Sequence, residues 1–352
     1  MAPNSLKVKA ESPMKLAPMR PRAFALWLAW FTLAFGSAHA GAQSCQTSTE
    51  LEDATRTAIT SAGQRFFDMA SKGDAASMRQ NAVPNLASDF AGIEATVKDH
   101  QQDLSGAQAS VKTVYLLDAT GAEPAQQAEF LCGVFGKNGQ TAGSAAFYLN
   151  DLAPGKYSVV LLDATSSRGK TMFSEILMQV GTDWKLAGLY VKSGQVAGHD
   201  SDWFLDHARQ YKAKGQSHNA WLFYVQTIDL VSRGMRFMSS LATDKLYDEA
   251  QSVQPTDLPV AGKTVDLAAG TTTYKVSAVY PWTIGSDLEL FVKYHVADVS
   301  NSNQSYQDNV AVIKALVTKF PELRDAFAGV EAIAIDNSGR DYGTLLAMKD
   351  IK

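Results

Sequence analysis

The sequence lacks charge clusters, has only two cysteines and, after residue 40, contains no long hydrophobic run. Charged residues make up 19% and hydrophobic residues 46% of the 352 positions, values typical of globular proteins, which excludes wholesale disorder. The length leaves room for two or three domains of about 100–200 residues each. After Phe35, no stretch approaches the ~18 apolar residues that a membrane-spanning helix needs.

Motifs for catalysis and cofactor binding are also missing. There is no G-x-S-x-G segment of the kind that positions a nucleophilic serine. The segment Arg168–Thr171 ends like a phosphate-binding loop, but Ala164 stands where the first glycine is required, and a strand is predicted to follow instead of a helix. Gly133, Gly136 and Gly139 span a strand end and a hairpin, so they do not form a dinucleotide fingerprint. We therefore predict no catalytic residues and no cofactor.

Histidines are few, and their spacing does not suit a metal site. His199 and His207 lie near Asp200 and Asp202, but the two histidines are on either side of a predicted helix start and lack the i, i+4 spacing of a zinc pair. Capping of that helix accounts for both aspartates without an ion. We predict no bound metal.

A secretory signal peptide is predicted over residues 1–40. Five basic residues precede the apolar run Ala23–Phe35, and Ala38-His39-Ala40 fits a cleavage site. An uncleaved anchor is disfavoured because this run is short for a membrane span. Cleavage removes five basic residues and one acidic residue, which leaves a net charge of −8 without a basic cluster. This charge argues against nucleic acid and anionic membranes as partners, and the leader predicts a periplasmic or secreted protein.

The two cysteines are Cys45 and Cys132. In an oxidising compartment they are a plausible disulfide that would tie the new N-terminus to a strand. Two alternatives stay open here, a lipidated Cys45 and an unpaired, buried Cys132. Ala42-Gln43-Ser44 lacks the apolar residue of a bacterial lipobox, which disfavours lipidation. A catalytic thiol is the least favoured reading because neither cysteine has a histidine near it in sequence.

Residues 51–195 have the pattern of an α+β domain that follows a flexible lead over residues 41–50. Apolar residues at helical spacing predict three helices before about Asp103, with a break near Pro84. Alternating and apolar runs then predict strands at Val111–Asp118, Glu129–Phe135, Ala145–Asn150, Tyr157–Leu162, Met172–Val180 and Trp184–Val191. Within the first of these strands, Val111, Thr113, Tyr115 and Leu117 are predicted to share one face. Helices followed by antiparallel strands predict a helical layer on a sheet.

Some of these segments match a known family pattern. They are Phe66–Ala70, the Lys72-Gly73-Asp74 turn, Pro84, Phe90 and the closing Gly181–Leu189. Together they resemble the nuclear transport factor 2-like, or cystatin-like cone, superfamily over about residues 50–193. The resemblance implies a concave sheet closed by helices. That superfamily contains enzymes, ligand binders and non-catalytic adaptors, so the resemblance does not select a function.

A cone of this kind can hold an apolar pocket with a few polar groups. Strand alternation places Trp184, Leu186, Gly188 and Tyr190 on one face of the last strand. The candidate pocket residues, for a small apolar ligand, are Tyr115, Ser174, Trp184 and Tyr190. The competing interpretation, that these side chains fill the core, is the more common outcome for aromatic residues in strands. Ligand binding that survives both Tyr115→Phe and Tyr190→Phe would argue against the pocket.

Residues 200–253 are predicted to form a helical connector. Over about residues 201–234 the sequence resembles one tetratricopeptide repeat. The residues that match its pattern are Phe204, Ala208, Tyr211, Gly215, Ala220 and Tyr224. His207 and Thr227 depart from that pattern, and no second copy follows. A self-standing array needs about three copies, so we predict a single helical hairpin.

Residues 260–352 predict a second α+β domain, a two-layer α/β sandwich without a recognisable family. Strands are expected at Lys263–Ala268, Thr272–Trp282 and Leu288–Ala297, and a hairpin at Val330–Met348. Between them we expect a polar loop at Asn301–Ser305, a helix at Asn309–Phe320 and a short helix at Glu322–Phe327.

Two hypotheses on function follow. The first is a secreted or periplasmic, non-enzymatic binding or scaffold protein with a protein partner in the envelope or outside the cell. The second is a small-ligand carrier or enzyme that uses the pocket of the cone-like domain, which would require a titratable pair facing inward.

Overall fold

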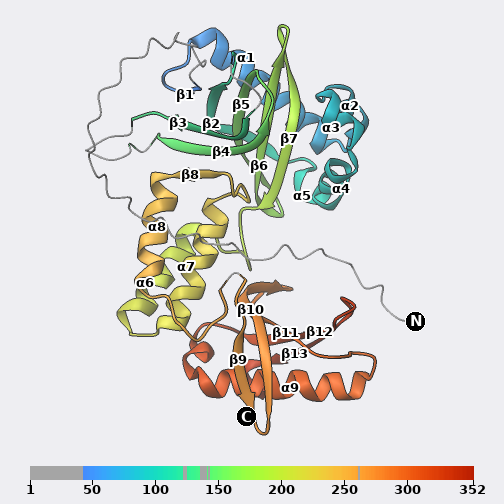
Figure 1. Ribbon diagram of the computed structural model, residues 1–352, viewed down its shortest axis with the longest axis vertical. Helices are drawn as coiled ribbons and strands as arrows, with labels where there is room; N and C mark the ends of the chain where they lie inside the picture. The colour runs from blue at the N-terminus through green and yellow to red at the C-terminus, as the bar shows by residue number, and fades with distance from the viewer. Residues whose placement is uncertain (1–42, 122–124, 135–140, 142, 261) are drawn as a thin grey trace, which may run out of the picture. The chain divides into compact units, whose positions relative to one another are not determined.

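The computed structural model describes residues 43–121, 125–134, 141, 143–260 and 262–352, and it has the predicted α+β class (Figure 1). The predicted signal peptide and the predicted turn Gly136–Gly139 lie outside the described residues. The chain forms two compact units. Of the described residues, the N-terminal unit contains 43–206 with 224–252, and the C-terminal unit contains 207–223 with 253–352. The predicted helical connector therefore contributes to both units.

Two sheets build the N-terminal unit. The larger has the order β1-β2-β5-β6-β7, with every neighbouring pair antiparallel. The smaller has the order β3-β4-β8 and includes a short strand that the sequence did not indicate. Their bounds are β1 Ser44–Thr47, β2 Gln108–Asp118, β3 Ala125–Cys132, β4 Ala145–Leu152, β5 Lys156–Ser166, β6 Gly169–Val180, β7 Asp183–Ser193 and β8 Met238–Ser240.

Among the described residues, five helices precede β2 instead of the three predicted, and they cover one face of the larger sheet (Figure 1). They are α1 Asp53–Ser71, α2 Ala75–Gln80, α3 Pro84–Ser88, α4 Ala91–Asp99 and α5 Gln101–Leu104. The first helix buries Ile59, Phe66 and Phe67 at helical spacing against the strands. Asp74 caps α2 as predicted, since its Oδ1 accepts the backbone N–H of Ser77 at 3.0 Å.

The larger sheet separates two hydrophobic cores. On the helical face, Phe173 packs edge-on against Phe67, with 5.3 Å between ring centroids. On the other face, Tyr115 packs against Phe147 of the smaller sheet at 5.1 Å. The chain thus buries apolar residues on both sides of its central strands, which explains the nearly continuous apolar run of β5.

In the described part of the N-terminal unit, two β-bulges overturn the strict alternation expected from the sequence. The pairing register shifts between Val111 and Thr113, where Lys112 is the extra residue, and again opposite Ile176 and Leu177, where Ala187 is extra. Each extra residue turns the preceding part of its strand to the opposite face. Val111 therefore packs with the helical-side core, whereas Tyr115 belongs to the other core.

The remaining helices of the middle region are α6 Ser201–Ala213, α7 Ser217–Val231 and α8 Leu241–Gln251. A capping box starts α8, because the side chains of Ser240 and Thr243 each bond the other residue's backbone N–H. None of the helices in the described part of the chain is long and apolar enough to cross a membrane.

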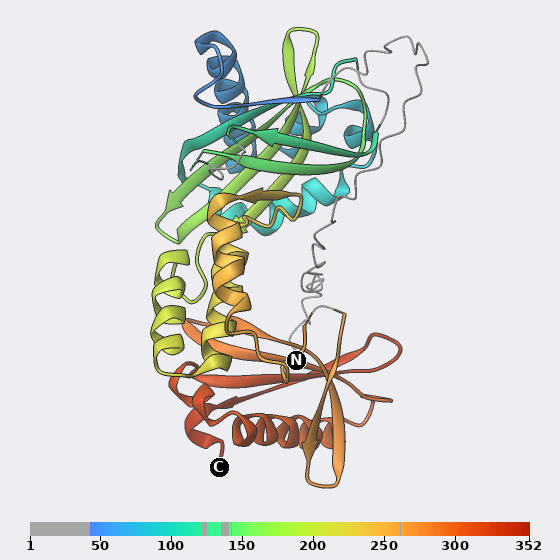
Figure 2. The same cartoon turned by 60° about the vertical axis from the view of Figure 1, so that its left-hand side comes forward.

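One five-stranded sheet with the order β13-β12-β11-β10-β9 builds the C-terminal unit. Its elements are β9 Val265–Ala269, β10 Thr272–Ile284, β11 Asp287–His295, α9 Ser302–Lys319, η1 Pro321–Asp325, β12 Gly329–Ile335, β13 Asp341–Ala347 and η2 Met348–Asp350. All pairs are antiparallel except β11 with β12, which α9 connects. This helix lies along one face of the sheet, as the turned view in Figure 2 shows.

The helix α9 begins seven residues earlier than predicted. The expected polar loop Asn301–Ser305 is wrong, because Ser302 already starts the helix and the side chain of Asn301 caps it by accepting the N–H of Gln304. Buried Asn309 of this helix joins Tyr294 and Thr344 in hydrogen bonds of 2.8 and 3.0 Å. That network fixes the helix on the sheet.

Candidate functional site

The strand β9 forms one edge of the C-terminal sheet and pairs only with β10 among the described strands. It reads Val-Asp-Leu-Ala-Ala. Leu267 is buried, whereas Asp266 and Ala268 are exposed. Edge strands present unpaired N–H and C=O groups, and natural proteins usually protect such edges with lysine, proline or a covering segment. By contrast, Val83 of the N-terminal unit donates its N–H to the carbonyl of Leu186 at 2.8 Å and so covers edge strand β7.

A groove runs beside β9, and α9 forms its other wall. The helix contributes Ala311, Lys314, Ala315 and Thr318, whose spacing places them on one stripe. Small side chains on both walls, including Ala268, Ala269 and Gly270 on the strand side, leave a volume of ≈ 670 Å³. This volume is within the range of ~300–1,000 Å³ that ligand sites occupy. An extended segment paired to β9 would fill it.

The groove has a positive charge excess. Lys314 is exposed and has no ion-pair partner among the described residues, and Lys319 lies at the same wall. Among the described residues that line the groove, Asp266 is the only acid, and it is already paired with Lys275 at 3.1 Å. Lys319 lies 3.9 Å from Asp257 and 4.9 Å from the centre of the Phe320 ring. An occupant with acidic side chains is therefore electrostatically complementary.

The end of α9 is held by the partly buried His218. Each ring nitrogen of His218 lies near a carboxylate, with 2.5 Å from Nδ1 to Glu322 and 2.9 Å from Nε2 to Asp257. Burial would raise the pKa of Asp257, but the hydrogen bond with His218 and the charges of His218 and Lys319 bring that pKa below its usual value. These contacts fix the position of Asp257, and with it the ion pair to Lys319.

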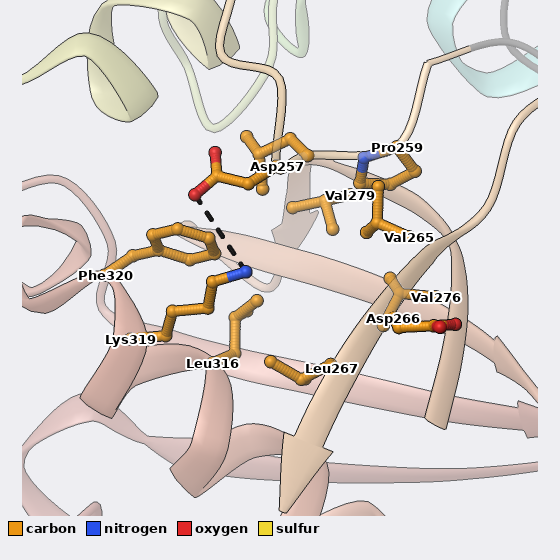
Figure 3. A pocket seen from close by; sticks show the side chains of 11 residues that line it. Asp257, Pro259, Val265, Asp266, Leu267, Val276, Val279, Leu316, Lys319 and Phe320 are labelled. Atoms are coloured by element: carbon orange, nitrogen blue, oxygen red, sulfur yellow. Dashed lines mark ion pairs between the residues drawn. The ribbon is translucent and has the colours of Figure 1, made fainter. Parts of the chain in front are cut away.

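A second cavity adjoins this network (Figure 3). Asp257 and Lys319 lie at one side and apolar chains such as Val265 and Leu267 at the other. Its volume is only ≈ 10 Å³, about the room for a single water molecule. We therefore treat it as a packing gap that supports the groove.

The four predicted pocket residues do not come together. Tyr115 is 5% exposed and packs against Phe147, and Tyr190 packs on the same side of the sheet against Phe237 at 5.4 Å. Trp184 lies in the core on the opposite, helical side because the bulge at Ala187 turns it over. The expected shared face of Trp184 and Tyr190 is thus wrong.

The fourth residue, Ser174, is buried and accepts a hydrogen bond from Arg233 Nε at 3.0 Å. Arg233 also bonds the carboxylate of Asp163, at 2.5 Å, and the carbonyl of Leu162. Sequence reasoning missed this buried arginine, which occupies the polar end of the predicted pocket. Its only sequence signal is the Ser232-Arg233-Gly234 turn after an apolar helix.

A buried acid was also missed. Glu175 of β6 is fully buried on the helical side, and neither carboxylate oxygen has a hydrogen-bond partner among the described residues. Burial raises its pKa well above the usual value, and the charge of Arg65 offsets this only in part. An acid inside the run Thr171–Leu177 was the available signal. It is a single carboxylic acid, not the inward-facing pair that an enzyme was expected to need.

The cysteines and histidines have structural contacts. Cys45 and Cys132 form a disulfide that joins β1 to β3. His199 stacks on Trp203 with 3.7 Å between ring centroids. No group of three or more potential metal ligands occurs in the part of the chain that the structure describes.

No family model, no curated protein and no solved structure matches this chain. The resemblances to the cone superfamily and to a tetratricopeptide repeat therefore remain predictions.

Proposed function

We propose that this protein is a non-enzymatic binding protein of an oxidising, extracytoplasmic compartment, and that it captures an extended acidic peptide segment of a partner along β9. The single observation that carries the proposal is the groove of ≈ 670 Å³ between the edge of β9, which no other described strand pairs, and the small-residue stripe of α9. Addition of a strand to an exposed sheet edge is a common mode of peptide recognition. The compartment is supported by the disulfide and the predicted leader.

The groove chemistry favours peptide over small apolar ligand. Backbone groups of β9 would supply hydrogen bonds, and Lys314 would attract an acidic side chain on the occupant. A small ligand between Tyr115, Ser174 and Tyr190 would instead have to displace Phe147 or the bonds of Arg233. The carrier or enzyme alternative therefore has less support.

Fluorescence anisotropy with labelled eight-residue peptides tests the proposal. The peptides alternate valine with aspartate, asparagine or lysine, and a fourth peptide has the aspartate sequence with N-methylated alternate backbone nitrogens. We expect the aspartate peptide to bind at least tenfold more tightly than the lysine peptide, and N-methylation to abolish binding because it removes strand-pairing donors. Equal binding of the methylated peptide, or no binding of any peptide, would overturn the proposal.

Variants of the groove give a second measurement. Ala315→Trp should fill the groove, and Lys314→Glu should invert the preference between acidic and basic peptides. Lys349→Glu is the matched control, since it makes the same charge change beyond β13, at the opposite edge of the sheet. If the variants leave peptide binding intact, or if the protein instead dimerises through β9, the proposed occupant is wrong.

A further inference from the structure

The C-terminal sheet has a second face that α9 does not cover. Strand alternation directs Leu290, Val292 and Tyr294 of β11 toward α9, where all three are fully buried. The opposite face therefore carries Phe291, with Tyr280 of β10 as its antiparallel partner and Glu331 of β12 as its parallel partner. Trp282 remains 42% exposed on this face, and Leu345 of β13 is exposed to the same extent.

Three aromatic rings form a continuous panel here. Tyr280 and Phe291 stack with 4.7 Å between centroids and 27° between planes. Trp282 lies 6.1 Å from Phe291 and 6.2 Å from Tyr280. The plane of Trp282 is inclined by 52° to Phe291 and by 78° to Tyr280, and its exposed ring offers an electron-rich face that attracts cations.

Two carboxylates flank the panel. Glu289 is the cross-strand partner of Trp282, is only 6% exposed, and has a carboxylate oxygen without a hydrogen-bond partner among the described residues. Glu331 lies beside Phe291. Room for both acids comes from neighbouring glycines, since a Cβ added to Gly329 would lie 2.5 Å from Glu289 Oε2, and one added to Gly343 would lie 3.3 Å from Glu331 Oε1.

Neither acid forms an ion pair with a cation of the described residues. Burial raises the pKa of Glu331, and burial followed by the charges of Asp287 and Glu331 raises the pKa of Glu289. Burial, and then the charge of Glu331, also raises the pKa of Tyr280 to about 12. Alternation along β11 places Lys293 and His295 further along this face, yet neither forms an ion pair with either glutamate among the described residues. A positive charge from outside would relieve this excess.

We propose that this face binds an arginine side chain of a partner protein, with the guanidinium stacked on the exposed ring of Trp282 and hydrogen-bonded to Glu289 and Glu331. The planar, weakly hydrated guanidinium combines stacking with forked donation to carboxylates, which an ammonium does not. This site is separate from the β9 groove, because its residues come from the uncovered face and the groove is lined by β9 and α9.

The test is a titration of ¹⁵N-labelled protein followed at the Trp282 indole N–H, which is assigned with Trp282→Phe. The probes are doubly blocked arginine, lysine and norleucine, and an arginine-containing tripeptide. We expect a saturable shift with blocked arginine, at least threefold weaker binding of blocked lysine, and no specific shift with norleucine. Tighter binding of the tripeptide than of blocked arginine would favour a polypeptide chain as the source of the guanidinium. Equal binding would limit recognition to the side chain alone and would overturn the assignment to a partner protein.

Variants complete the test. Glu331→Gln should weaken blocked-arginine binding at least fivefold, and Glu289→Gln should add to that loss where the variant folds. Glu94→Gln, on the exposed face of α4, removes one carboxylate elsewhere and should leave blocked-arginine binding unchanged. Equal shifts with norleucine and arginine would show an apolar surface only, and an unchanged affinity in folded Glu331→Gln would overturn the assigned counter-ion. Lys314→Glu, which tests the peptide groove, should leave this titration unaltered.

Discussion

Gly63 of α1 lies directly over the buried carboxyl group of Glu175. A Cβ added at Gly63 would be 3.0 Å from Glu175 Oε2 and 2.8 Å from Val160 Cγ1. The helix can approach the sheet here only because residue 63 has no side chain. The same approach excludes water from Glu175, and both of its oxygens stay without hydrogen bonds among the described residues. The close packing of α1 on the sheet is therefore also the cause of the desolvation of Glu175.

Glu175→Gln should stabilise the protein at neutral and alkaline pH. The folded-state pKa of Glu175 is raised above the unfolded value of 4.5, so the folded state holds the proton more tightly. Stability is then greatest below about pH 4.5 and falls as the pH rises toward the folded pKa. We expect a gain of about 1–2 kcal/mol at pH 8 and little change at pH 4.

Urea unfolding at both pH values measures this difference. Glu94→Gln on the exposed face of α4 serves as the control: it removes a charge from the first turn of a helix and should therefore cost less than ~1 kcal/mol at pH 8, the opposite sign to Glu175→Gln. A Glu175→Gln variant that is less stable at pH 8 would contradict the assignment of a neutral, buried acid.

Gly63→Ala should destabilise the N-terminal unit, although alanine is the better helix former. The methyl group would clash with Val160, and overpacking of a core costs about 1–3 kcal/mol, more than the ~1 kcal/mol gained from helix propensity. The control is Gly92→Ala in α4, where nothing lies within 4 Å and a gain of about 0.5–1 kcal/mol is expected. Thermal unfolding would show opposite shifts in Tm, and the addition of Val160→Ala should partly rescue Gly63→Ala.

Arg233→Met should destabilise the protein by about 2–3 kcal/mol at pH 7, because the arginine is buried and bonds Ser174, Asp163 and Leu162. Burial would raise the pKa of Asp163, but the hydrogen bond and charge of Arg233, with a contribution from Lys112, bring it below 3.8. The stabilisation that Arg233 gives to the charged Asp163 is present above the pKa of the unfolded state, and it is lost as the pH falls through the pKa of the folded state.

The stability gap between wild type and Arg233→Met should therefore narrow below about pH 4. Lys112→Met is the matched control: Lys112 is exposed and lies 3.5 Å from the same carboxylate, so its loss should cost less than ~1 kcal/mol. Equal effects of the two substitutions in denaturant titrations would show that burial of Arg233 does not matter.

Loss of the disulfide should lower the free energy of unfolding by about 2–5 kcal/mol, since the bond closes a long loop between residues 87 positions apart. The double variant Cys45→Ser/Cys132→Ser, measured by urea unfolding with and without reductant, checks this. Reductant should destabilise only the wild type. Mass spectrometry of the mature protein would also reveal a lipidated Cys45, which would contradict the disulfide.

Most of the elements could be predicted from the sequence because their signals are local. Apolar spacing and the Asp74 cap located the first helices, and apolar runs located β5, β6 and β7 within a few residues. The C-terminal hairpin was also correctly placed. The class of fold follows from the order of these elements.

The candidate site could not be predicted, because it depends on which strand lies at an edge. Nothing local in Val265–Ala269 distinguishes an outer strand from an inner one. In the sequence, the spacing of Ala311 and Ala315 fits the buried side of a helix as well as it fits the wall of a groove. Arg233 was missed for a related reason, since its partners in β5 and β6 lie 59 or more residues away in sequence.

The bulge at Ala187 has a consequence for how β7 can vary. Because of this one extra residue, Trp184 serves the core on one side of the sheet and Tyr190 the core on the other. Deletion of Ala187 would restore an uninterrupted ladder but direct an indole away from the helices and into the opposite core. A substitution along this strand therefore changes the packing of one core at a time, whereas a change in its length would misplace side chains with respect to both cores.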